Sequence, residues 1–469
     1  MRKAIALLVS LAFLTASCVI MAKPAFSSTE VTDNTWVKKA PMHQARASLG
    51  VAVVDGKIYA IGGSTGNDES SHGEIVSTNE EYDPVTDTWM FRKSMPTARY
   101  GFAIAVYQNK IYCIGGVTSY STSSGYDVTG INEVYNPATD TWETKTPMPT
   151  ARDSLQANVV NDRFYLIGGY VPDNSGLGAI SSLNEVYDPA TDSWTTKAQI
   201  PTATIGYASA VVNNQIYIIK QSTQIYDAKT DAWSYGEPIP STAGSYSGYA
   251  TAAATTGVFS LKRIYLFSQA SVSNQIYNPD SDSWTVGANL PTKRGGAAVA
   301  VVDDMLYVIG GKIYNFAYPD DTFGVSVKAY AVNEQYTPVG YRTVPPVINV
   351  VSPRSQPYNE SGVSLVFTVN KPVNWTGFSL DGGESVTIGG NTTITGLANG
   401  LHNITVYTKD TYGNTGASGT VSFTVEVPYP ATVVIASVTV VAAIGLSLAS
   451  YLIKNKKASS TAQHNNQNG

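Results

Sequence analysis

The chain has 469 residues, a formal net charge of −5 and a sequence pI near 5.5. It carries no basic surplus that would fit nucleic acid, so no nucleic-acid partner is expected. Charged residues make up only 14% of the chain, which holds 30 tyrosines and 40 glycines. This composition favours tyrosine-rich strands joined by glycine turns over helices.

Residues 1–27 predict a signal peptide. Arg2 and Lys3 precede an apolar run from Ala4 to Ala22, and small residues follow it. This order of charged, apolar and small residues is typical of a secretory signal. A lipoprotein cleavage site at Cys18 and an uncleaved anchor remain open alternatives. Once Cys18 is removed with the signal, Cys113 has no partner in the chain, so no internal disulfide is expected.

A Tyr followed seven residues later by a Trp occurs five times between residues 82 and 284. The intervening Asn, Asp, Pro and Thr residues favour tight turns, so each copy predicts a strand, a turn and a strand. The copies are Tyr82 and Trp89, Tyr135 and Trp142, Tyr187 and Trp194, Tyr226 and Trp233, and Tyr277 and Trp284.

Two further strands precede each hairpin, and in the first copy they are 50–54 and 57–63, the second of which ends in Gly-Gly. Four strands in a period of about 50 residues are typical of a β-propeller blade. The Tyr-x-Ile-Gly-Gly strands and the Tyr–Trp hairpins make residues 36–343 resemble the kelch-repeat family. The resemblance implies an all-β propeller. Its second strands, at Tyr59, Tyr112, Tyr165, Tyr217, Tyr265 and Tyr307, give six blades.

The two ends of the repeat region complement each other. Trp36 has no Tyr seven residues before it, and Tyr336 has Thr343 where its Trp would stand. We therefore expect the strand of Trp36 to complete the sixth blade beside Tyr336, within a propeller over 28–343. Ring closure of this kind removes an exposed sheet edge.

Four units share an Arg before the innermost strand, a Gly-Gly after the second strand and a Glu on the third. The fourth unit has Thr204 and Gln224 instead, and the fifth also lacks all three features. Because the features occur as a set, we expect structural ion pairs, with the glycines leaving room for them. An anion-binding ring is the alternative. The pairs are Arg46 with Glu80, Arg99 with Glu133, Arg152 with Glu185, and Arg294 with Glu334.

Four long loops, 64–78, 117–131, 170–183 and 312–333, all join a second strand to a third strand and so share one face of the propeller. Loops on a rigid scaffold commonly carry binding residues, so we expect this face to bind an extracellular protein or glycan. The candidate binding residues are Tyr120, Tyr126, Tyr170, Tyr314, Phe316, Tyr318 and Phe323.

Residues 344–428 begin with a stiff Pro-Pro linker and continue as short alternating strands, which predicts a β-sandwich. The segment resembles immunoglobulin or fibronectin type III modules, with Trp375 as the candidate core aromatic residue and without the cysteine pair. It also holds four Asn-x-Ser/Thr sequences, which are candidate glycosylation sites. These are Asn359, Asn374, Asn391 and Asn403.

Residues 431–453 carry no charge, and lysines follow them at 454, 456 and 457. The pattern predicts a transmembrane helix with a cytoplasmic tail over 454–469. Together with the signal peptide, it predicts a single-pass plasma-membrane protein whose N-terminal part lies outside the cell.

The sequence offers little for catalysis. Propellers of the kelch type include copper oxidases and sugar epimerases, but a copper site needs converging ligands. The chain has four histidines, of which His402 and His464 lie outside the propeller. We therefore expect no catalytic residue, no cofactor and no metal, and a non-catalytic binding or adhesion module at the cell surface. A carbohydrate-active enzyme and a structural envelope component are the alternatives.

Overall fold

The structure is a computed structural model. It describes residues 32–66, 73–121, 125–172, 178–240, 250–268, 274–317, 324–428, 442–444 and 446–456. The chain divides into two compact units. The first, called here the propeller, comprises Met1–Ala254 and Ile264–Val339, and the second unit comprises Thr255–Arg263 and Gly340–Gly469.

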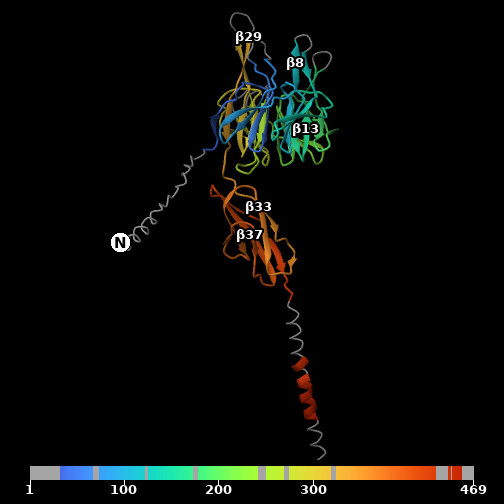
Figure 1. The fold of residues 1–469 in the computed structure, drawn as a ribbon, viewed down its shortest axis with the longest axis vertical. Helices are drawn as coiled ribbons and strands as arrows, with labels where there is room; N and C mark the ends of the chain where they lie inside the picture. Colours follow the sequence, from blue (N-terminus) through green and yellow to red (C-terminus); the bar gives the residue numbers. More distant parts are fainter. Residues whose placement is uncertain are drawn as a thin grey trace, which may run out of the picture. The chain divides into compact units, whose positions relative to one another are not determined.

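The propeller contains six four-stranded antiparallel sheets, the blades (Figure 1). Blade one has β2 (Gly50–Val54), β3 (Lys57–Ile61), β4 (Asn79–Asp83) and β5 (Thr88–Arg92). Blade two has β6 (Ala103–Tyr107), β7 (Lys110–Ile114), β10 (Asn132–Asn136) and β11 (Thr141–Lys145). Blade three has β12 (Gln156–Val160), β13 (Arg163–Ile167), β16 (Asn184–Asp188) and β17 (Ser193–Thr196).

Blade four has β18 (Ala208–Val212), β19 (Gln215–Ile219), β20 (Thr223–Asp227) and β21 (Ala232–Gly236). Blade five has β22 (Ala250–Ala254), β23 (Ile264–Ser268), β24 (Asn274–Asn278) and β25 (Ser283–Gly287). Blade six has β26 (Ala298–Val302), β27 (Met305–Ile309), β30 (Asn333–Thr337) and, from the other end of the repeat region, β1 (Thr35–Lys39).

The innermost strands form a closed ring. They contact one another in the cyclic order β2, β6, β12, β18, β22, β26 and back to β2. Small residues make this possible, because blades crowd together toward the axis and only short side chains fit the taper. The central residue of the innermost strand is a buried alanine in five blades, for example Ala52 and Ala105, and Asn158 in blade three.

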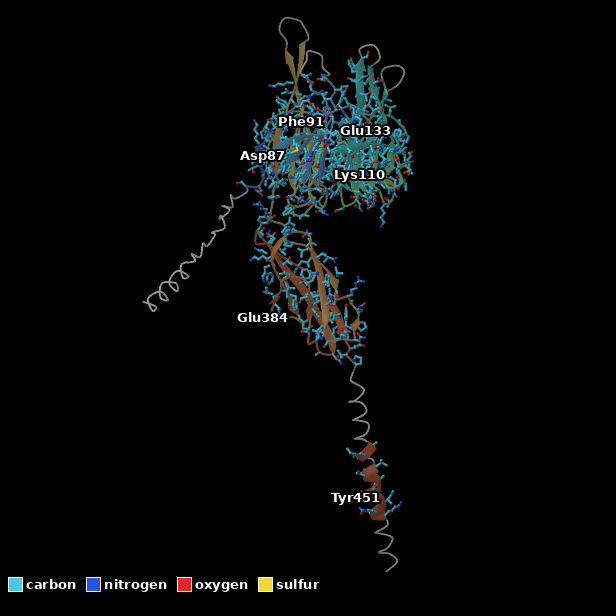
Figure 2. The ribbon with its side chains drawn as sticks, in the orientation of Figure 1. Asp87, Phe91, Lys110, Glu133, Glu384 and Tyr451 are labelled. Carbon is cyan, nitrogen blue, oxygen red and sulfur yellow. The ribbon has the colours of Figure 1, made fainter. Side chains whose placement is uncertain are left out.

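The repeated Tyr–Trp hairpin ties each blade to the one before it. In blade one, Tyr82 lies opposite Trp89, and its hydroxyl donates to Asp87 Oδ1 at 2.6 Å (Asp87 is labelled in Figure 2). The same carboxylate oxygen accepts the backbone N–H of Ala40 at 2.9 Å, and the Trp89 indole donates to the carbonyl of Ala40 at 2.7 Å. Asp87 has a left-handed backbone conformation in the turn, with φ of 55°, which Asp tolerates better than most residues do.

This arrangement, called here the blade junction, recurs. The Tyr hydroxyl donates to the turn Asp in Tyr82–Asp87, Tyr135–Asp140, Tyr187–Asp192, Tyr226–Asp231 and Tyr277–Asp282, at 2.5–2.7 Å. Each Asp also accepts a backbone N–H from the segment that leaves the preceding blade. The turn residues of the sequence pattern therefore also join neighbouring blades.

Blade six closes the ring through its N-terminal strand. β1 pairs with β30, and Trp36 lies opposite Tyr336. Asn34 takes the place of the junction Asp, since its Oδ1 accepts the Tyr336 hydroxyl at 2.8 Å and the N–H of Ala288 at 2.6 Å. The Trp36 indole donates to the carbonyl of Ala288 at 2.9 Å. The closing strand thus reproduces the blade junction with a neutral amide.

Three of the four long loops contain β-hairpins. These pair β8 (Val117–Ser121) with β9 (Gly125–Val128), β14 (Tyr170–Val171) with β15 (Ala179–Ile180), and β28 (Lys312–Ala317) with β29 (Gly324–Ala329). The labelled strands β8 and β29 extend from the same side of the propeller (Figure 1). The described part of the fourth loop forms isolated bridges through Ser64 to Ala47 and Ile75.

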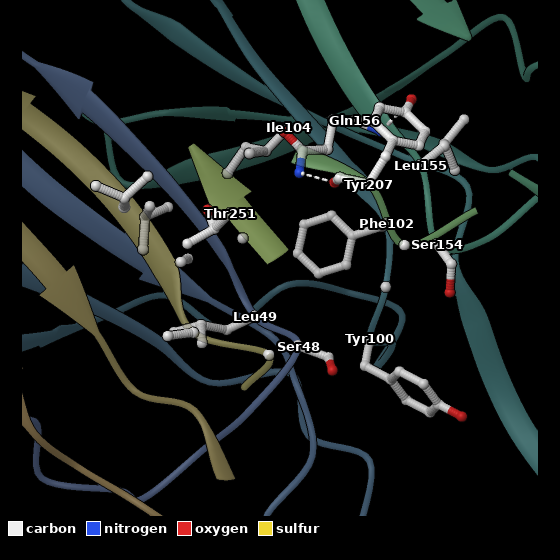
Figure 3. Close-up of a pocket in the computed structure, with 18 of the residues that line it drawn as sticks. Ser48, Leu49, Tyr100, Phe102, Ile104, Ser154, Leu155, Gln156, Tyr207 and Thr251 are labelled. Atoms are coloured by element: carbon white, nitrogen blue, oxygen red, sulfur yellow. Dashed lines mark hydrogen bonds between the residues drawn. The ribbon is translucent and has the colours of Figure 1, made fainter. Parts of the chain in front are cut away.

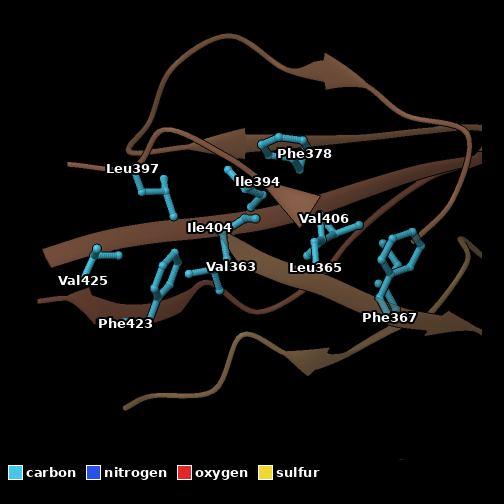
Figure 4. Close-up of a cluster of buried hydrophobic side chains, with 11 residues drawn as sticks. Val363, Leu365, Phe367, Phe378, Ile394, Leu397, Ile404, Val406, Phe423 and Val425 are labelled. Carbon is cyan, nitrogen blue, oxygen red and sulfur yellow. The ribbon is translucent and has the colours of Figure 1, made fainter. Parts of the chain in front are cut away.

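The second unit contains two sheets with a common core (Figure 4). One has β31 (Ile348–Ser352), β33 (Val363–Val369) and β36 (Thr392–Ile394). The other has β32 (Pro357–Tyr358), β39 (Val421–Val425), β37 (Gly400–Asp410), β34 (Val373–Leu380), β35 (Val386–Thr387) and β38 (Thr415–Ala417). The core aromatic residues are Phe367, Phe378 and Phe423, whereas Trp375 lies outside this cluster and donates to Thr387 Oγ1 at 3.1 Å.

The predicted transmembrane helix over 431–453 is wrong. Within the described residues, no helix is long and apolar enough to cross a membrane. The helical positions described in this part of the chain are 442–444 and 446–456. At about 1.5 Å per residue this span covers ~22 Å, against about 30 Å of hydrocarbon. The predictions of a single-pass plasma-membrane protein, a membrane anchor and a cytoplasmic tail fall with this helix. The predicted signal peptide, 1–27, lies outside the described residues.

Candidate functional site

The structure brings together each of the four predicted Arg–Glu pairs. Each arginine side chain is fully buried, and its guanidinium contacts the glutamate of the same blade. The closest N–O distances are 2.9 Å in Arg46–Glu80, 2.5 Å in Arg99–Glu133, 2.8 Å in Arg152–Glu185 and 2.6 Å in Arg294–Glu334 (Glu133 is labelled in Figure 2). Burial lowers the pKa of Arg46 to about 10, although Glu80 favours its charged form.

The Gly-Gly sequences serve a different purpose from the one expected. Gly62 and Gly63 both have positive φ. A Cβ at Gly62 would lie 2.6 Å from the backbone oxygen of Arg99 in the next blade, and the N–H of Gly63 donates to that oxygen at 3.0 Å. The glycines therefore let neighbouring blades approach. The guanidinium lies against the second strand, where Arg46 donates to the carbonyls of Ala60 and Gly62.

A cavity of about 560 Å³ opens at the start of the innermost strands (Figure 3). All six blades line it, and none of the eight residues of the Arg–Glu pairs does. Its lining includes one residue from each innermost strand, the second in the strand: Val51, Ile104, Ala157, Ser209, Thr251 and Val299.

The rim of the cavity is held by backbone hydrogen bonds between blades. The N–H of Ser48 donates to the carbonyl of Gly296 at 2.7 Å, that of Gly101 to Ser48 at 3.0 Å, that of Ser154 to Gly101 at 2.8 Å, and that of Gly206 to Ser154 at 3.1 Å. These five residues have φ between 54° and 65°. Each lies two positions before its innermost strand. The rim is therefore part of the scaffold, which makes the cavity preformed.

One wall of the cavity is polar. Gln156 Nε2 donates to the carbonyl of Tyr207 at 2.9 Å, and Ser209 Oγ donates to Gln156 Oε1 at 2.9 Å (Figure 3). The Tyr207 hydroxyl donates to the carbonyl of Ile167, and burial raises the pKa of Tyr207 to about 12. The side chain of Phe102 forms an apolar part of the lining. The cavity thus combines apolar area with a few fixed polar groups.

Aromatic side chains flank the cavity on blade two. Tyr120 and Tyr126 pair across the β8–β9 hairpin, with ring centroids 4.9 Å apart, and each is 39% exposed. Tyr126 lines the cavity, and so does Tyr100, which is not among the binding residues predicted from the sequence. Tyr100 follows the repeat arginine Arg99 directly, and this position next to the rim was the available signal.

The other predicted binding residues are not among the described residues that line the cavity. Tyr170 lies in β14, where it bridges Asp153. Tyr314 and Phe316 lie in β28, and their side chains are not described. Tyr318 and Phe323 lie outside the described residues.

The described residues show no metal centre, because they hold no group of three or more His, Cys, Asp or Glu side chains that could bind a metal ion. Cys113 is buried in β7, and burial raises the pKa of its thiol to about 12. A thiol with so high a pKa forms little thiolate at neutral pH and is a poor nucleophile.

The candidate glycosylation sites differ in exposure. Asn359, Asn374 and Asn391 are exposed, and the side-chain oxygen of Asn391 accepts the N–H of Phe367 at 3.0 Å. Asn403 is half-buried, and its side-chain oxygen accepts the Ser422 hydroxyl at 2.6 Å. Glycosylation of these residues stays a prediction.

Residues 48–268 match the model of the KLHDC2/KLHL20/DRC7 kelch-repeats domain. The chain is 25% identical to Kelch-like protein 15 of Mus musculus over 300 residues, which are 61% of this chain and 42% of that protein. It is 33% identical to Kelch-like protein 15 of Danio rerio over 199 residues, 40% of this chain and 32% of that protein. It is 28% identical to Kelch-like protein 36 of Bos taurus over 270 residues, 57% of this chain and 35% of that protein. The chain thus spans less than half the length of each of these relatives.

A solved structure titled "Structure of YjhT" matches 62% of this chain and 95% of that chain, with 14% identity and a TM-score of 0.46. The family match and the similar proteins confirm the all-β, kelch-type character of the repeat region. The immunoglobulin or fibronectin kinship of residues 344–428 stays a prediction.

Proposed function

We propose that the propeller is a non-catalytic, protein-binding module whose partner engages the cavity mouth and the β8–β9 hairpin. The observation that carries this proposal is the exposed Tyr120–Tyr126 pair beside the 560 Å³ cavity. Tyrosines supply a large contact area at a low cost in conformational entropy, and they are enriched where interfaces carry most of their binding energy. The kelch-repeat match supports a binding role, because kelch-type propellers commonly bind proteins.

The backbone hydrogen bonds of the rim support the same proposal. They hold the blade ends that line the cavity in fixed positions, for example between Ser48 and Gly101. A partner would therefore meet a surface that needs little ordering on binding, which reduces the entropic cost of association. The β8–β9 hairpin adds an aromatic wall to this rigid mouth.

The test compares the full chain with two variants in capture from an extract of the cells that produce it, followed by mass spectrometry. The double variant Tyr120→Ser/Tyr126→Ser should lose the partners that the wild-type chain captures. The control Tyr235→Ser removes a tyrosine that is 60% exposed on β21, away from the residues that line the cavity, and should keep them. Equal capture by all three chains would contradict a binding role for the hairpin.

The role of the four Arg–Glu pairs is also a proposal. We infer that they tie the first, second and third strands of their blades together and do not bind a ligand. The argument is that their guanidinium groups are buried and bonded to glutamate and to strand carbonyls, as in Arg152 with Glu185 and Leu166. Substitutions of Arg152 and Glu185 test this inference through their effect on the free energy of unfolding.

A further inference from the structure

A buried carboxylate without a full set of partners lies next to the cavity rim. Asp153 is only 7% exposed, and its Oδ2 accepts the hydroxyl of Ser154 at 2.7 Å. Its other oxygen, Oδ1, is buried and has no hydrogen-bond partner within the described chain. Asp153 also takes part in none of the ion pairs between described residues. Its sequence neighbour Arg152 pairs with Glu185 instead.

The repeat does not require an acid at this place. Asp153 directly follows the repeat arginine of blade three. The corresponding residues of the other blades in the described chain are all uncharged: Ala47, Tyr100, Ile205 and Gly295. Since the fold forms around neutral residues at this position in four blades, packing gives no reason for a carboxylate in blade three.

Asp153 lies directly behind the cavity lining. Ser154, which its carboxylate contacts, lines the cavity, and so does Gly101 of blade two. A Cβ built at Gly101 would lie 3.8 Å from Asp153 Oδ2 and no closer than 3.5 Å to any other atom. The absence of a side chain at Gly101 therefore leaves space beside Oδ2, the carboxylate oxygen that accepts the Ser154 hydroxyl.

Burying an ionised carboxylate with one oxygen unpaired is unfavourable. Burial raises the pKa of Asp153 to about 6, so the group is still mostly ionised at pH 7. A cation that reached this oxygen would offset the desolvation that the folded chain already imposes. Charge-assisted hydrogen bonds of that kind are stronger than neutral ones.

We propose that Asp153 accepts a basic side chain, arginine or lysine, that the protein partner inserts into the cavity. Tyr100 and Tyr126 are among the residues that line the same cavity, and the faces of aromatic rings attract guanidinium and ammonium groups. Lys312 of blade six also lines the cavity, three blades from Asp153 along the ring, so the cavity disfavours a basic group on that side. This inference rests on the proposed binding function and specifies the chemistry of the partner.

The experiment uses the full chain and two small probes of nearly equal shape. Nα-acetyl-arginine amide carries the guanidinium, and Nα-acetyl-citrulline amide carries a neutral urea group in its place. Binding is followed by ligand-observed NMR at low salt. We expect the arginine probe to bind the wild-type chain about tenfold more tightly or better, which is the usual range for a hydrogen bond to a charged group.

Two variants locate the effect. Asp153→Asn should bring the affinity for the arginine probe down to that for the citrulline probe. Asp162→Asn removes the same charge from an exposed turn at the other end of β12 and should preserve the preference for arginine. Thermal unfolding of Asp153→Asn should show a midpoint equal to or above that of the wild type, because the variant removes an uncompensated buried charge.

Three outcomes would overturn the inference. They are equal binding of the two probes or no binding of either, a preference for arginine that survives in Asp153→Asn, and an equal loss of preference in Asp162→Asn. The proposed function has its own readout, since partner capture depends on Tyr120 and Tyr126. If the tyrosine variant loses partner capture but the wild-type chain binds both probes equally, the role of Asp153 is refuted and the proposed binding function is not.

Discussion

Blade three holds Glu185 against the buried guanidinium of Arg152, whereas blade four has Gln224 and Thr204 at these two positions. Gln224 Oε1 accepts the N–H of Thr202 at 2.9 Å, and its Nε2 donates to the carbonyl of Thr202 at 3.3 Å. In blade three, Glu185 accepts the hydroxyl of Thr150, which precedes the arginine by two residues as Thr202 precedes Thr204. Both third strands are thus bonded to the segment before the innermost strand.

The two blades meet the same requirement of the fold with different side chains. The blade needs a polar third-strand residue that reaches the segment before the first strand, and a neutral amide suffices. A carboxylate is needed only where an arginine is buried beside it. Buried ion pairs are often no more stabilising than neutral replacements, but removing one partner strands the other charge. Substitutions in blades three and four test this distinction.

The largest effect is expected from Arg152→Met. Methionine keeps much of the volume but leaves the Glu185 carboxylate buried without its guanidinium, so the propeller should lose about 3–5 kcal/mol of unfolding free energy. Urea unfolding followed by tryptophan fluorescence measures it. A Trp375→Phe background removes the signal of the second unit. A loss below about 1 kcal/mol would contradict the proposed structural role of the pair.

Blade four should respond less to the loss of its third-strand polar group. Gln224→Ala removes two neutral hydrogen bonds to Thr202 and strands no charge. We expect a loss of about 1–2 kcal/mol in the same assay. The matched variant in blade three, Glu185→Ala, should cost more than twice as much. Equal losses in the two blades would show that the charge of the pair is not what makes blade three sensitive.

The double variant Arg152→Met/Glu185→Gln makes blade three neutral, as blade four is. It should lie within about 1 kcal/mol of the wild type, because neither charge is left stranded. The two single substitutions should therefore be strongly non-additive. Additive losses would indicate that the arginine and the glutamate act independently.

The smallest effect concerns the blade junctions, where ionised Asp140 can be compared with neutral Asn34. The hydroxyl of Tyr135 and the N–H of Lys93 hold the pKa of Asp140 below its usual value. A carboxyl group whose pKa is lower in the folded chain stabilises the fold at any pH above its unfolded-state pKa of about 3.9. This stabilisation is lost as the pH falls through the folded-state pKa. Asp140→Asn should thus be slightly less stable than the wild type at pH 7, and the difference should vanish toward pH 3. Urea midpoints of both chains across this range measure it, and a constant difference would contradict the prediction.

The sequence predicted those features that repeat within one blade. The Tyr–Trp hairpins, the second strands and the pairing of Arg99 with Glu133 all appear because they recur at fixed spacing. The blade junction was interpreted only as a turn, because the N–H that Asp140 accepts comes from Lys93, 47 residues earlier and in another blade. A contact between neighbouring blades joins residues that are about one repeat apart. In the sequence, such a separation looks the same as the repeat period itself.

The remaining misses have other physical causes. Asp153 appears in one blade alone, so only its burial marks it. Trp375 was assigned to the sandwich core from its size, whereas phenylalanines such as Phe423 fill that core and the indole bonds to Thr387 at the surface of the sheet. The transmembrane prediction over 431–453 rested on hydropathy, which reports side-chain polarity but does not fix the length of a helix.

The closing strand β1 is synthesised long before the strand with which it pairs. Asn34 and Tyr336, which meet in blade six, are 302 positions apart. A ribosome adds about 5–20 residues per second, so on the order of 15–60 s separate the synthesis of β1 from that of its partner β30. Over that interval the five preceding blades can form in turn while β1 has no strand to join. A chaperone that acts on this protein during translation would therefore bind β1, because this strand is made before the strands of the blades and pairs only after β30 has been made.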